Sequence, residues 1–558
     1  MPSESTTPWV DGLTIGQVLA QTAERHAAGE ALVFPQLGRR WTWRQFAADV
    51  DAAARGLLAL GIQTGEHVAL WATNVPEWVM LQFATARIGA VLVNINPSYR
   101  PFELQYVLNQ SDSVALFLVD QFKTSDYFSM LAEVCPQIAA ATNGQVKSPQ
   151  YPRLRRVVAL KGKPPAGLLL WDQMVEQGQA VPLGELDRIG KALHADQPIN
   201  IQYTSGTTGF PKAATLSHRN LLLNAYHVGG CQKFTENDRL CIPVPFYHCF
   251  GCVLGTMACA VYGTTMIVPA EYFQPTPTLD ALEKERATAL YGVPTMYIAQ
   301  LQDPSLPGRQ INTLRTGIMS GAPCPIEVMR QVIEKLGPSE LTIAYGQTEA
   351  SPVITQTRTD DPLELRVETV GRPLPGVEVK IVDPATGAAL PDNQQGELCA
   401  RGHVVMLGYY NNEEATRAAI DAEGWLHTGD LAIRLPNGYY KITGRLKDMV
   451  IRGGENVYPR EIEEFLFTHP AVEQAAVVGL PDPKYGEELC AWIKLKTGQT
   501  VTADEIRAFC RAQLAHFKVP RYVKFVEAFP QTVTGKIQKF KIRDLMKEEL
   551  GLAEQKTA

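Results

Sequence analysis

Hydrophobic residues in the first part of the chain follow two different spacings. Residues 43–60 (WRQFAADVDAAARGLLAL) place apolar side chains at helical intervals, and residues 77–88 do the same. Short apolar runs at 67–71 and 90–94 lie beside these segments and are typical of buried strands. Strands interleaved with helices in this way predict a mostly parallel α/β sheet. The rhythm resumes near Ile199 and continues to about Gln356.

The pattern changes in the last third of the chain. Residues 371–444 contain short strand-like runs punctuated by glycine and proline, which indicates a small β unit. Beyond Gly444, strand-like runs at 475–480 and 522–529 accompany helical patterns near 459–468 and 503–514. About 110 residues suffice for a small domain of its own, so we expect an α+β unit here. A polar, turn-rich stretch at 136–152 is expected to be a surface loop.

Length and charge narrow the choice of function. The chain has 558 residues, 52 basic and 58 acidic, with a net charge of −6. So small a net charge argues against nonspecific binding to nucleic acid or to anionic lipid, both of which need a basic surface. No apolar run reaches the roughly 20 residues of a membrane helix, and no secretory signal is recognisable, so we expect a cytoplasmic protein without a transmembrane segment.

The ten cysteines are clustered, with six of them between Cys231 and Cys324. In a large chain without a secretory signal this suggests reduced thiols that pack as small hydrophobic side chains. Cys249 and Cys252 have the spacing of a zinc or redox pair, but no second Cys/His pair follows at ligand spacing. Core packing is therefore the expected role of these cysteines.

A strand-like run at 199–203 leads into a segment rich in glycine and hydroxyl groups. Glycines let backbone N–H groups approach an anion, hydroxyls donate hydrogen bonds, and a lysine adds positive charge. The pattern is not the Gly-x4-Gly-Lys-Ser/Thr phosphate loop, because its glycines are three apart and a proline precedes the lysine. From composition alone, a phosphate loop and a polar surface loop both stay open. The residues concerned are Thr204, Ser205, Gly206, Thr207, Thr208, Gly209 and Lys212.

This loop and further motifs in the same order resemble the adenylate-forming enzymes, which include acyl-CoA synthetases, amino-acid adenylation domains and firefly-type luciferases. The resemblance covers essentially the whole chain. It is greatest, at 245–257, 442–459 and 535–540, to medium-chain fatty acyl-CoA synthetases. The further motifs lie at 245–251 (PFYHCFG), 345–349 (YGQTE), 425–430 (WLHTGD), 444–448 (GRLKD), 453–459 (GGENVYP) and 534–536 (TGK).

The resemblance implies a reaction in two steps. A carboxylate attacks the α-phosphorus of ATP and expels pyrophosphate, and the thiol of coenzyme A then attacks the acyl carbon of the acyl-AMP and expels AMP. ATP, Mg²⁺, coenzyme A and a fatty acid are the implied ligands. Both steps move negative charge among phosphates, so cations and hydrogen-bond donors matter more than a covalent nucleophile.

The resemblance also assigns roles to residues. Lys536 would stabilise charge on the reacting carboxylate and α-phosphate, Thr348 would contact the α-phosphate, and Glu349 would bind the metal. With His248, an acyl-site position, these are the catalytic candidates; a fatty carboxylate is already ionised at neutral pH and needs no general base. The implied ATP- and AMP-binding residues are the 204–212 loop, Gly321, Tyr345 on adenine, Thr348, Asp430 on the ribose hydroxyls, Arg445 and Lys536. The implied acyl pocket comprises Phe246, His248, Phe250, Gly251 and Gly346.

Lys447 matches the hinge of the family. The resemblance thus implies a large N-terminal domain (1–446) and a small mobile C-terminal domain (447–558) that rotates about Lys447. Gly453 and Gly454 would let the pantetheine arm of coenzyme A pass, although a simple turn would explain the pair equally.

Alternatives to a medium-chain enzyme stay open at this point. The chain could be a CoA ligase for short branched, terpenoid or aromatic acids, or an amino-acid adenylation domain that serves a carrier protein. Residues 245–251 offer no acidic group for a substrate ammonium, which disfavours the second. A further alternative for the activity is a non-catalytic scaffold that binds nucleotide. The protein could also form a homodimer.

Overall fold

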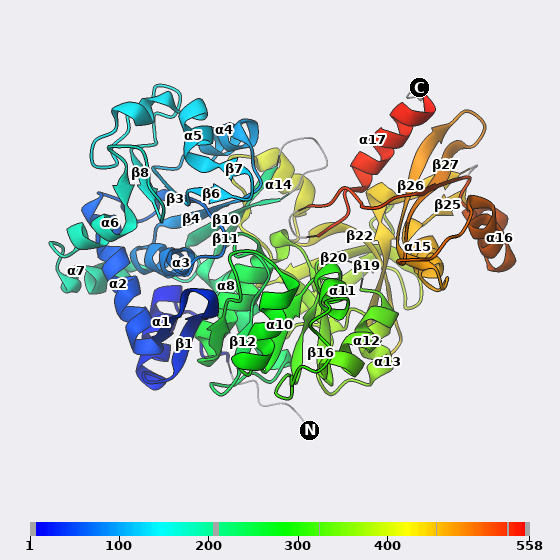
Figure 1. Ribbon diagram of the computed structural model, residues 1–558, viewed down its shortest axis with the longest axis horizontal. Helices are drawn as coiled ribbons and strands as arrows, with labels where there is room; N and C mark the ends of the chain where they lie inside the picture. Colours follow the sequence, from blue (N-terminus) through cyan, green and yellow to red (C-terminus); the bar gives the residue numbers. More distant parts are fainter. Residues whose placement is uncertain (1–6, 205–210, 323, 453–454, 533–534, 553–558) are drawn as a thin grey trace.

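The computed structural model describes residues 7–204, 211–322, 324–452, 455–532 and 535–552. Figure 1 shows a large body that contains two helix-covered sheets, and a smaller C-terminal part that projects from it at the upper right. The α/β class and this division into a large and a small part are as the sequence predicts.

Two large sheets form the body, and parallel strands make up most of each. One has nine strands in the order β18-β17-β16-β15-β14-β12-β13-β1-β2, and the other has eight in the order β21-β11-β10-β4-β3-β5-β8-β9. The strands of the first sheet are β1 Glu30–Phe34, β2 Arg39–Thr42, β12 Arg239–Cys241, β13 Thr265–Ile267, β14 Ala289–Gly292, β15 Thr316–Met319, β16 Glu340–Gly346, β17 Val353–Gln356 and β18 Arg372–Pro373. Those of the second are β3 His67–Trp71, β4 Val91–Ile95, β5 Ala115–Leu118, β8 Arg156–Ala159, β9 Leu169–Leu170, β10 Pro198–Thr204, β11 Lys212–Ser217 and β21 Gly408–Tyr409.

Helices cover and connect these sheets (Figure 1). They are α1 Ile15–Arg25, α2 Trp43–Ala59, α3 Pro76–Ile88, α4 Pro101–Gln110, α5 Tyr127–Val134, α6 Trp171–Gly178, α7 Leu183–Ala192, α8 His218–Cys231, α9 Ala258–Tyr262, α10 Pro275–Lys284, α11 Pro294–Leu301, α12 Ile326–Leu336, α13 Leu363–Glu368 and α14 Glu413–Ala419. Short 3-10 turns are η1 Pro35–Leu37, η2 Pro136–Ala140, η4 Thr348–Ala350, η5 Leu446–Asp448 and η6 His516–Lys518, and a two-stranded hairpin joins β6 Gln121–Phe122 to β7 Ser125–Asp126.

The predicted β unit is a four-stranded antiparallel sheet in the order β19-β20-β22-β23. Its strands are β19 Val377–Val382, β20 Gln395–Gly402, β22 Leu426–Arg434 and β23 Tyr440–Arg445. The hydrophobic core of the two large sheets continues into this unit through Leu426, Ala432 and Ile442. The β unit is therefore packed as part of the body.

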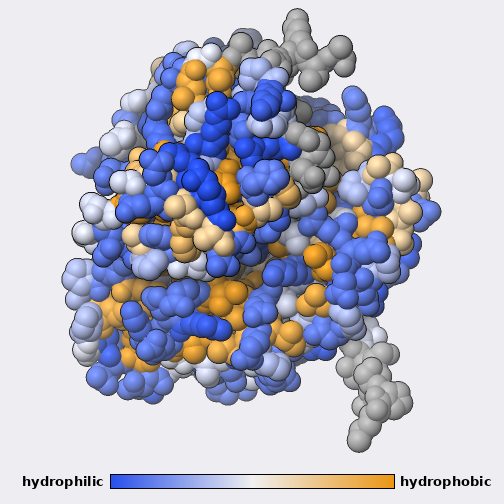
Figure 2. Space-filling view, turned by 90° about the vertical axis from the view of Figure 1, so that its right-hand side faces the viewer, coloured by the Kyte–Doolittle hydropathy of each residue, from blue (hydrophilic) through white to orange (hydrophobic). Residues whose placement is uncertain are grey.

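The C-terminal part has a five-stranded sheet with helices on both faces. Its elements are β24 Val450–Arg452, β25 Glu455–Val457, α15 Pro459–Phe467, β26 Val472–Asp482, β27 Gly486–Leu495, α16 Ala503–Gln513, β28 Tyr522–Phe525 and α17 Lys539–Leu550. Ile462 and Ile506 pack on one face of the sheet, and Ile542 and Met546 on the other. Figure 2 shows the side of the molecule where this part lies, with hydrophobic and hydrophilic side chains interspersed on the surface.

Most predicted elements are confirmed. The strand predicted at 67–71 is β3, and the helix predicted at 43–60 is α2, whose Thr42 cap bonds reciprocally with Gln45. The prediction of a surface loop at 136–152 is wrong in part, because η2 begins there and Ile138, Val146 and Tyr151 are buried. Isolated apolar residues in a polar segment without regular spacing give no signal of burial, so the sequence did not reveal these buried side chains.

An unexpected π-helix, η3, runs from Phe250 to Met257 and continues into α9. All eight of its residues are buried. Gln82 Nε2 and Thr256 Oγ1 donate to the carbonyl of Cys252, at 2.9 and 2.7 Å. Buried side chains thus help to satisfy the backbone of a wide helical turn, a kind of turn that often marks functional sites.

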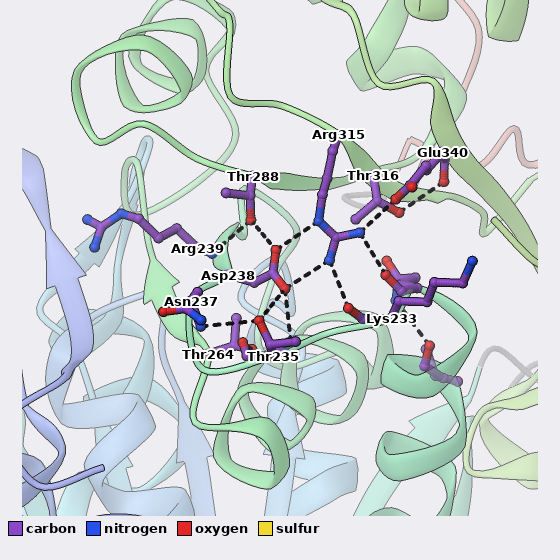
Figure 3. Close-up of polar contacts among 12 residues, drawn as sticks. Lys233, Thr235, Asn237, Asp238, Arg239, Thr264, Thr288, Arg315, Thr316 and Glu340 are labelled. Carbon is purple, nitrogen blue, oxygen red and sulfur yellow. Dashed lines mark hydrogen bonds and ion pairs between the residues drawn. The ribbon is translucent and has the colours of Figure 1, made fainter.

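An ion pair between a buried carboxylate and a half-buried guanidinium ties together the starts of four neighbouring parallel strands (Figure 3). Arg315 donates to Asp238 through Nε and Nη2, at 3.0 and 2.8 Å, and through Nη1 to Glu340 at 2.7 Å. Asp238 also accepts from Thr288 Oγ1 at 2.7 Å and from the backbone N–H of Thr235 at 2.9 Å. These residues lie at or just before β12, β14, β15 and β16, at the end of the sheet away from the carboxyl ends of its strands.

Among the described residues, no helix is both long and apolar enough to cross a membrane. Every cysteine is free, and nine of the ten are buried. The predicted packing of cysteines as small hydrophobic side chains is therefore confirmed. Burial also raises the pKa of several of their thiols, which keeps them neutral; for Cys249 and Cys324 the pKa is about 12.

Candidate active site

Asp430 and Arg445 face each other across neighbouring strands. They are register partners in the β22–β23 pair, and Arg445 Nε lies 2.9 Å from Asp430 Oδ1. Tyr345, near the carboxyl end of β16, donates its hydroxyl to Asp430 Oδ2 at 2.8 Å. The charge of Asp430 raises the pKa of Arg445, and burial followed by the same charge raises that of Tyr345. Three predicted nucleotide-binding residues, from separate motifs, thus form one cluster.

Glu349 is the centre of a second group, in which two hydroxyl groups of the described residues donate hydrogen bonds to its carboxylate. Oε1 accepts from Tyr409 OH at 2.8 Å and from Thr204 Oγ1 at 3.2 Å. Lys212 pairs with Thr204 in the β10–β11 ladder and holds its ammonium 5.1 Å from the centre of the Tyr409 ring. Oxygen donors suit a hard cation such as Mg²⁺, so these residues fit the metal that the resemblance implies.

Lys536 reaches this region from the C-terminal part. Lys536 closes a turn with Thr532, whose N–H donates to the carbonyl of Lys536. Gly535 has φ +77°, and its N–H donates to the carbonyl of Thr532. A Cβ on Gly535 would collide with Thr295 of α11, so glycine lets the turn press against the body. Burial lowers the pKa of Lys536 to about 8, and the charge of Arg445 adds to this effect.

His248 lies at the entry to the π-helix. Its Nδ1 accepts from the N–H of Phe250 at 3.2 Å, and Cys249 Sγ lies 3.7 Å from Thr348 Oγ1. Burial lowers the pKa of His248 to about 4, with a smaller contribution from the charge of Lys536, so the imidazole is neutral at pH 7. A neutral ring suits an apolar pocket wall. The segment thus joins the Thr348 motif to the π-helix.

The other residues predicted for the acyl pocket carry out packing roles. Phe246 is fully buried with its ring 5.3 Å from that of Trp78, and Phe250 packs at 5.4 Å from Tyr291. A Cβ on Gly251 would meet the carbonyl of Pro245, and one on Gly346 would meet the carbonyl of Pro352. Both glycines are therefore required by the close approach of backbone segments.

Two further predicted positions lie near these groups. Gly321 follows β15 with φ +86°, and a Cβ there would come close to Val293, a residue that Gly535 also approaches. Lys447 is the middle residue of η5, between β23 of the body and β24 of the C-terminal sheet. Burial and the charge of Arg445 lower its pKa. Ser205, Gly206, Thr207, Thr208, Gly209, Gly453 and Gly454 lie outside the described residues.

Sequence reasoning missed Tyr409. Its hydroxyl bonds Glu349 and its ring lies under Lys212, so it connects two predicted motifs. The only local signal is a glycine followed by two tyrosines at 408–410, which is also common in ordinary strands. Tyr409 pairs with Ala214 of β11, a contact between distant segments that no periodicity reveals.

Comparison with known proteins gives a consistent result. The profile of the family described as AMP-binding enzyme matches residues 19–410, and that of the AMP-binding enzyme C-terminal domain matches residues 461–536. A putative acyl-CoA synthetase of Bacillus subtilis, YngI, is 51% identical over 540 residues, which are 97% of this chain and 98% of that protein. The human medium-chain acyl-CoA ligase ACSF2, named as mitochondrial, is 42% identical over 552 residues. The match spans 98% of this chain and 90% of the human protein.

Solved structures agree with the sequence relatives. An anthranilate CoA ligase, AuaEII, in complex with anthranoyl-AMP, has a TM-score of 0.85 at 26% identity, over 99% of this chain and 100% of its own. ATP-bound MatB from Rhodopseudomonas palustris has a TM-score of 0.81 at 29% identity, over 96% and 100% of the two chains.

Proposed function

The chain belongs to the AMP-binding enzyme family, and from that membership we propose that it is an ATP-dependent, AMP-forming acyl-CoA ligase for medium-chain fatty acids. The carboxylate oxygen of the acid forms a bond to the α-phosphorus as the bond to pyrophosphate breaks. The sulfur of coenzyme A then bonds the acyl carbon, AMP leaves, and the thiol gives up its proton.

The observation that carries the proposal is the meeting of Lys536 with the Asp430–Arg445–Tyr345 cluster. Gly535, the residue before Lys536, lies against Thr295 and Val293 of the body. The charges of Arg445 and Asp430 in the body act on the pKa of Lys536, the first lowering it and the second raising it. Two cations, Arg445 and Lys447, and two carboxylates, Asp430 and Asp448, act on the charge of this lysine. A phosphate bound beside Lys536 and Arg445 would be stabilised by both cations, which is the requirement of the adenylation step.

We assign roles to the other residues from their chemistry. Asp430 can accept from two ribose hydroxyls, Arg445 can contact the same nucleotide, and Tyr345 can pack on adenine. Thr348 would donate to the α-phosphate, and Thr204 to Lys212 would hold the β and γ phosphates. Glu349 would hold Mg²⁺, which supplies neutralisation of phosphate charge when bound.

The two half-reactions need different surroundings around the α-phosphate. Lys536 must leave before coenzyme A can enter, so we propose that residues 447–558 rotate about Lys447 after acyl-AMP has formed. Gly453 and Gly454 would then border the pantetheine arm. The position of Lys447 in a short turn between two sheets supports this hinge.

The acyl segment supports an apolar substrate. Residues 245–251 are aromatic or small, with a neutral histidine, and offer no charge to an ammonium group. Each methylene buried in such a pocket adds roughly 0.8 kcal/mol until the pocket ends, so kcat/KM should rise with chain length, peak around C6 to C12, and then fall. The anthranilate ligase among the similar structures keeps aromatic acids as the second candidate.

A substrate panel tests the proposal. Pyrophosphate release is measured for saturated acids from about C4 to C16, for benzoate and for amino acids, each with and without coenzyme A. A maximum at benzoate or at C16 would reject the medium-chain assignment and leave the ligase chemistry standing. Release with amino acids alone would reject the CoA ligase.

Cellular location and assembly are separate proposals. We propose a cytoplasmic enzyme: its free cysteines fit a reducing compartment, and a bacterial protein is 51% identical to it, while the vertebrate relatives are named as mitochondrial. Cell fractionation distinguishes the two. A homodimer would appear as a doubled mass, relative to 61.4 kDa, in sedimentation equilibrium.

A further inference from the structure

A compact group of side chains lies directly behind the turn that carries Asp430. Glu397 and Cys399 on β20 meet His427 on β22, and one potential ligand atom from each lies within 4.8 Å of the others. Asp421, in the segment before β22, approaches the far side of the imidazole, with Oδ2 3.5 Å from Nε2. Neither the mechanism above nor the sequence motifs give this group a task.

Two chemistries could explain it, a cation site and a hydrogen-bonded relay, and the distances decide between them. Tetrahedral zinc with N and O ligands at about 2.0–2.2 Å would set the two ligand atoms roughly 3.4 Å apart. His427 Nδ1 lies 2.9 Å from Glu397 Oε2, the separation of a direct hydrogen bond. Cys399 Sγ lies 3.5 Å from the same Nδ1, so the contact with Glu397 is the shorter of the two that this nitrogen makes. The geometry favours the relay.

Glu397 uses both carboxylate oxygens. Oε2 accepts from His427 Nδ1, and Oε1 accepts from the backbone N–H of Gly429 at 2.9 Å. The residue is only 8% exposed, so its charge depends on these contacts. Since an ionised carboxylate oxygen can only accept, His427 carries a proton on Nδ1, and the doubly protonated imidazolium can in addition donate from Nε2 to Asp421.

The Gly429 contact matters because the next residue in the chain is Asp430, and Gly429 itself has φ +69°. Thr428 donates its hydroxyl to the carbonyl of Leu398 at 2.6 Å and accepts from the N–H of Asp430 at 3.1 Å. Hydrogen bonds thus join Thr428 and Gly429 to β20 and Asp430 to Thr428. Among the described residues, Glu397 is the one charged side chain that accepts from a backbone N–H of this turn.

His427 is itself held from behind. Asp421 Oδ1 accepts from the N–H groups of Glu423 and Trp425, at 2.9 Å each, which fixes this carboxylate near Nε2. Asp421, His427, Glu397 and Gly429 therefore form a continuous series of polar contacts. It runs from the surface, where His427 and Asp421 are each about one-third exposed, to the backbone beside Asp430.

We propose that Glu397 is a positioning residue of the nucleotide site: it holds the N–H of Gly429, with His427 and Asp421 fixing its orientation, so that Asp430 presents its carboxylate to the ribose hydroxyls. This inference rests on the proposed role of Asp430 in binding ribose. Asp430 is a suitable target for such support, because ATP must compete with Arg445 and Tyr345 for its oxygens.

The test compares ATP with 2′,3′-dideoxy-ATP, which lacks the hydroxyls that Asp430 would bind. Dissociation constants are measured by calorimetry for the wild type and for Glu397→Ala, Glu397→Gln and Glu378→Ala. Glu378 is the matched control, because it lies on the adjacent strand β19. Its carboxylate pairs with Arg401 at 2.8 Å and makes no contact with the 428–430 turn among the described residues. Asp430→Asn serves as the reference for loss of ribose recognition.

Glu397→Ala should weaken ATP about tenfold, the value of one hydrogen bond to a charged group, and should scarcely change dideoxy-ATP. Glu397→Gln keeps an oxygen for Gly429 and should stay within about twofold of the wild type, as should Glu378→Ala. If Glu397→Ala binds both nucleotides as the wild type does, or weakens both equally, the positioning role is overturned.

A thermal melt shows whether Glu397→Ala is folded. If it is not, His427→Leu decides the matter, since it removes the group that orients Glu397: a reduced preference for ATP over dideoxy-ATP supports the proposal, and an unchanged preference overturns it. Failure of the proposed ligase activity is a separate result. In that case the wild type would still prefer ATP over dideoxy-ATP but would form no acyl-CoA with any acid of the panel.

Discussion

The pKa of Lys536 is lowered by burial and by the neighbouring charge of Arg445, and this gives the lysine two measurable properties. Removing its side chain should slow pyrophosphate release by about 10²–10³, since a group that stabilises developing charge in such a site is worth about that much. Thioester formation from supplied acyl-AMP should be spared, because Lys536 has left by then. Lys541→Ala, an exposed lysine of α17, is the control and should keep both rates. Equal loss of both half-reactions in Lys536→Ala would contradict the role.

The lowered pKa of Lys536 predicts a pH dependence. The ammonium is the active form, so its contribution is complete below the pKa of about 8 and is lost as the pH rises through that value. The kcat/KM of adenylation for ATP, which reports the free enzyme, should therefore fall above about pH 8. Bound ATP stabilises the ammonium, so the corresponding limb of kcat should lie at higher pH.

Lys536→Arg is the control for this profile, because a guanidinium stays charged across the range. Its residual activity should lack the alkaline fall. If the fall persists in Lys536→Arg at the same pH, another group is responsible.

Among the structural elements, the start of the nine-stranded sheet depends on the Asp238–Arg315 pair (Figure 3). Asp238→Ala removes the partner of a half-buried guanidinium and leaves Thr288 Oγ1 and the N–H of Thr235 without their acceptor. A buried donor left without its acceptor costs about 1–3 kcal/mol, while Arg315 keeps Glu340 and part of its hydration, so the free energy of unfolding of the body should fall by about 2–4 kcal/mol. Urea unfolding followed by tryptophan fluorescence measures it.

Arg188→Ala is the control for the Asp238–Arg315 pair, since Arg188 forms an exposed ion pair with Glu185 on α7. Its unfolding midpoint should match that of the wild type, because exposed pairs contribute little. A similar loss in both variants would mean that Asp238 acts as an ordinary surface charge.

At the scale of the whole molecule, the described arrangement brings Lys536 to the body and must change before coenzyme A reacts. Lys447→Pro should block that change, because proline fixes φ near −65°, a value that the 3-10 turn η5 already accepts. Acyl-AMP should still form in a single turnover, while its transfer to coenzyme A should collapse. Rapid-quench measurement of the two steps gives the answer.

Lys447→Ala keeps backbone freedom and should transfer the acyl group at nearly the wild-type rate. A Lys447→Pro enzyme that forms thioester as fast as Lys447→Ala would place the hinge elsewhere in the chain.

The amino-acid sequence by itself determined the α/β class and the small C-terminal part, because their apolar residues recur at helical and strand spacings. It determined the β unit through short strand-like runs punctuated by glycine and proline. It also indicated the chemistry, through short motifs whose glycines, hydroxyls and charges are informative without any fold. Helix α2 could be predicted to within one residue because its cap and its hydrophobic face lie in one continuous segment.

Only the tertiary structure decided which side chains meet. Tyr409 contacts Glu349, and Glu397 contacts Gly429, across sheets that join distant segments, and no local pattern encodes such pairs. The π-helix at 250–257 was hidden as well, because Gln82, which donates a hydrogen bond to its backbone, is far away in sequence. Local periodicity reports the interactions within an element, whereas these contacts depend on how elements pack against one another.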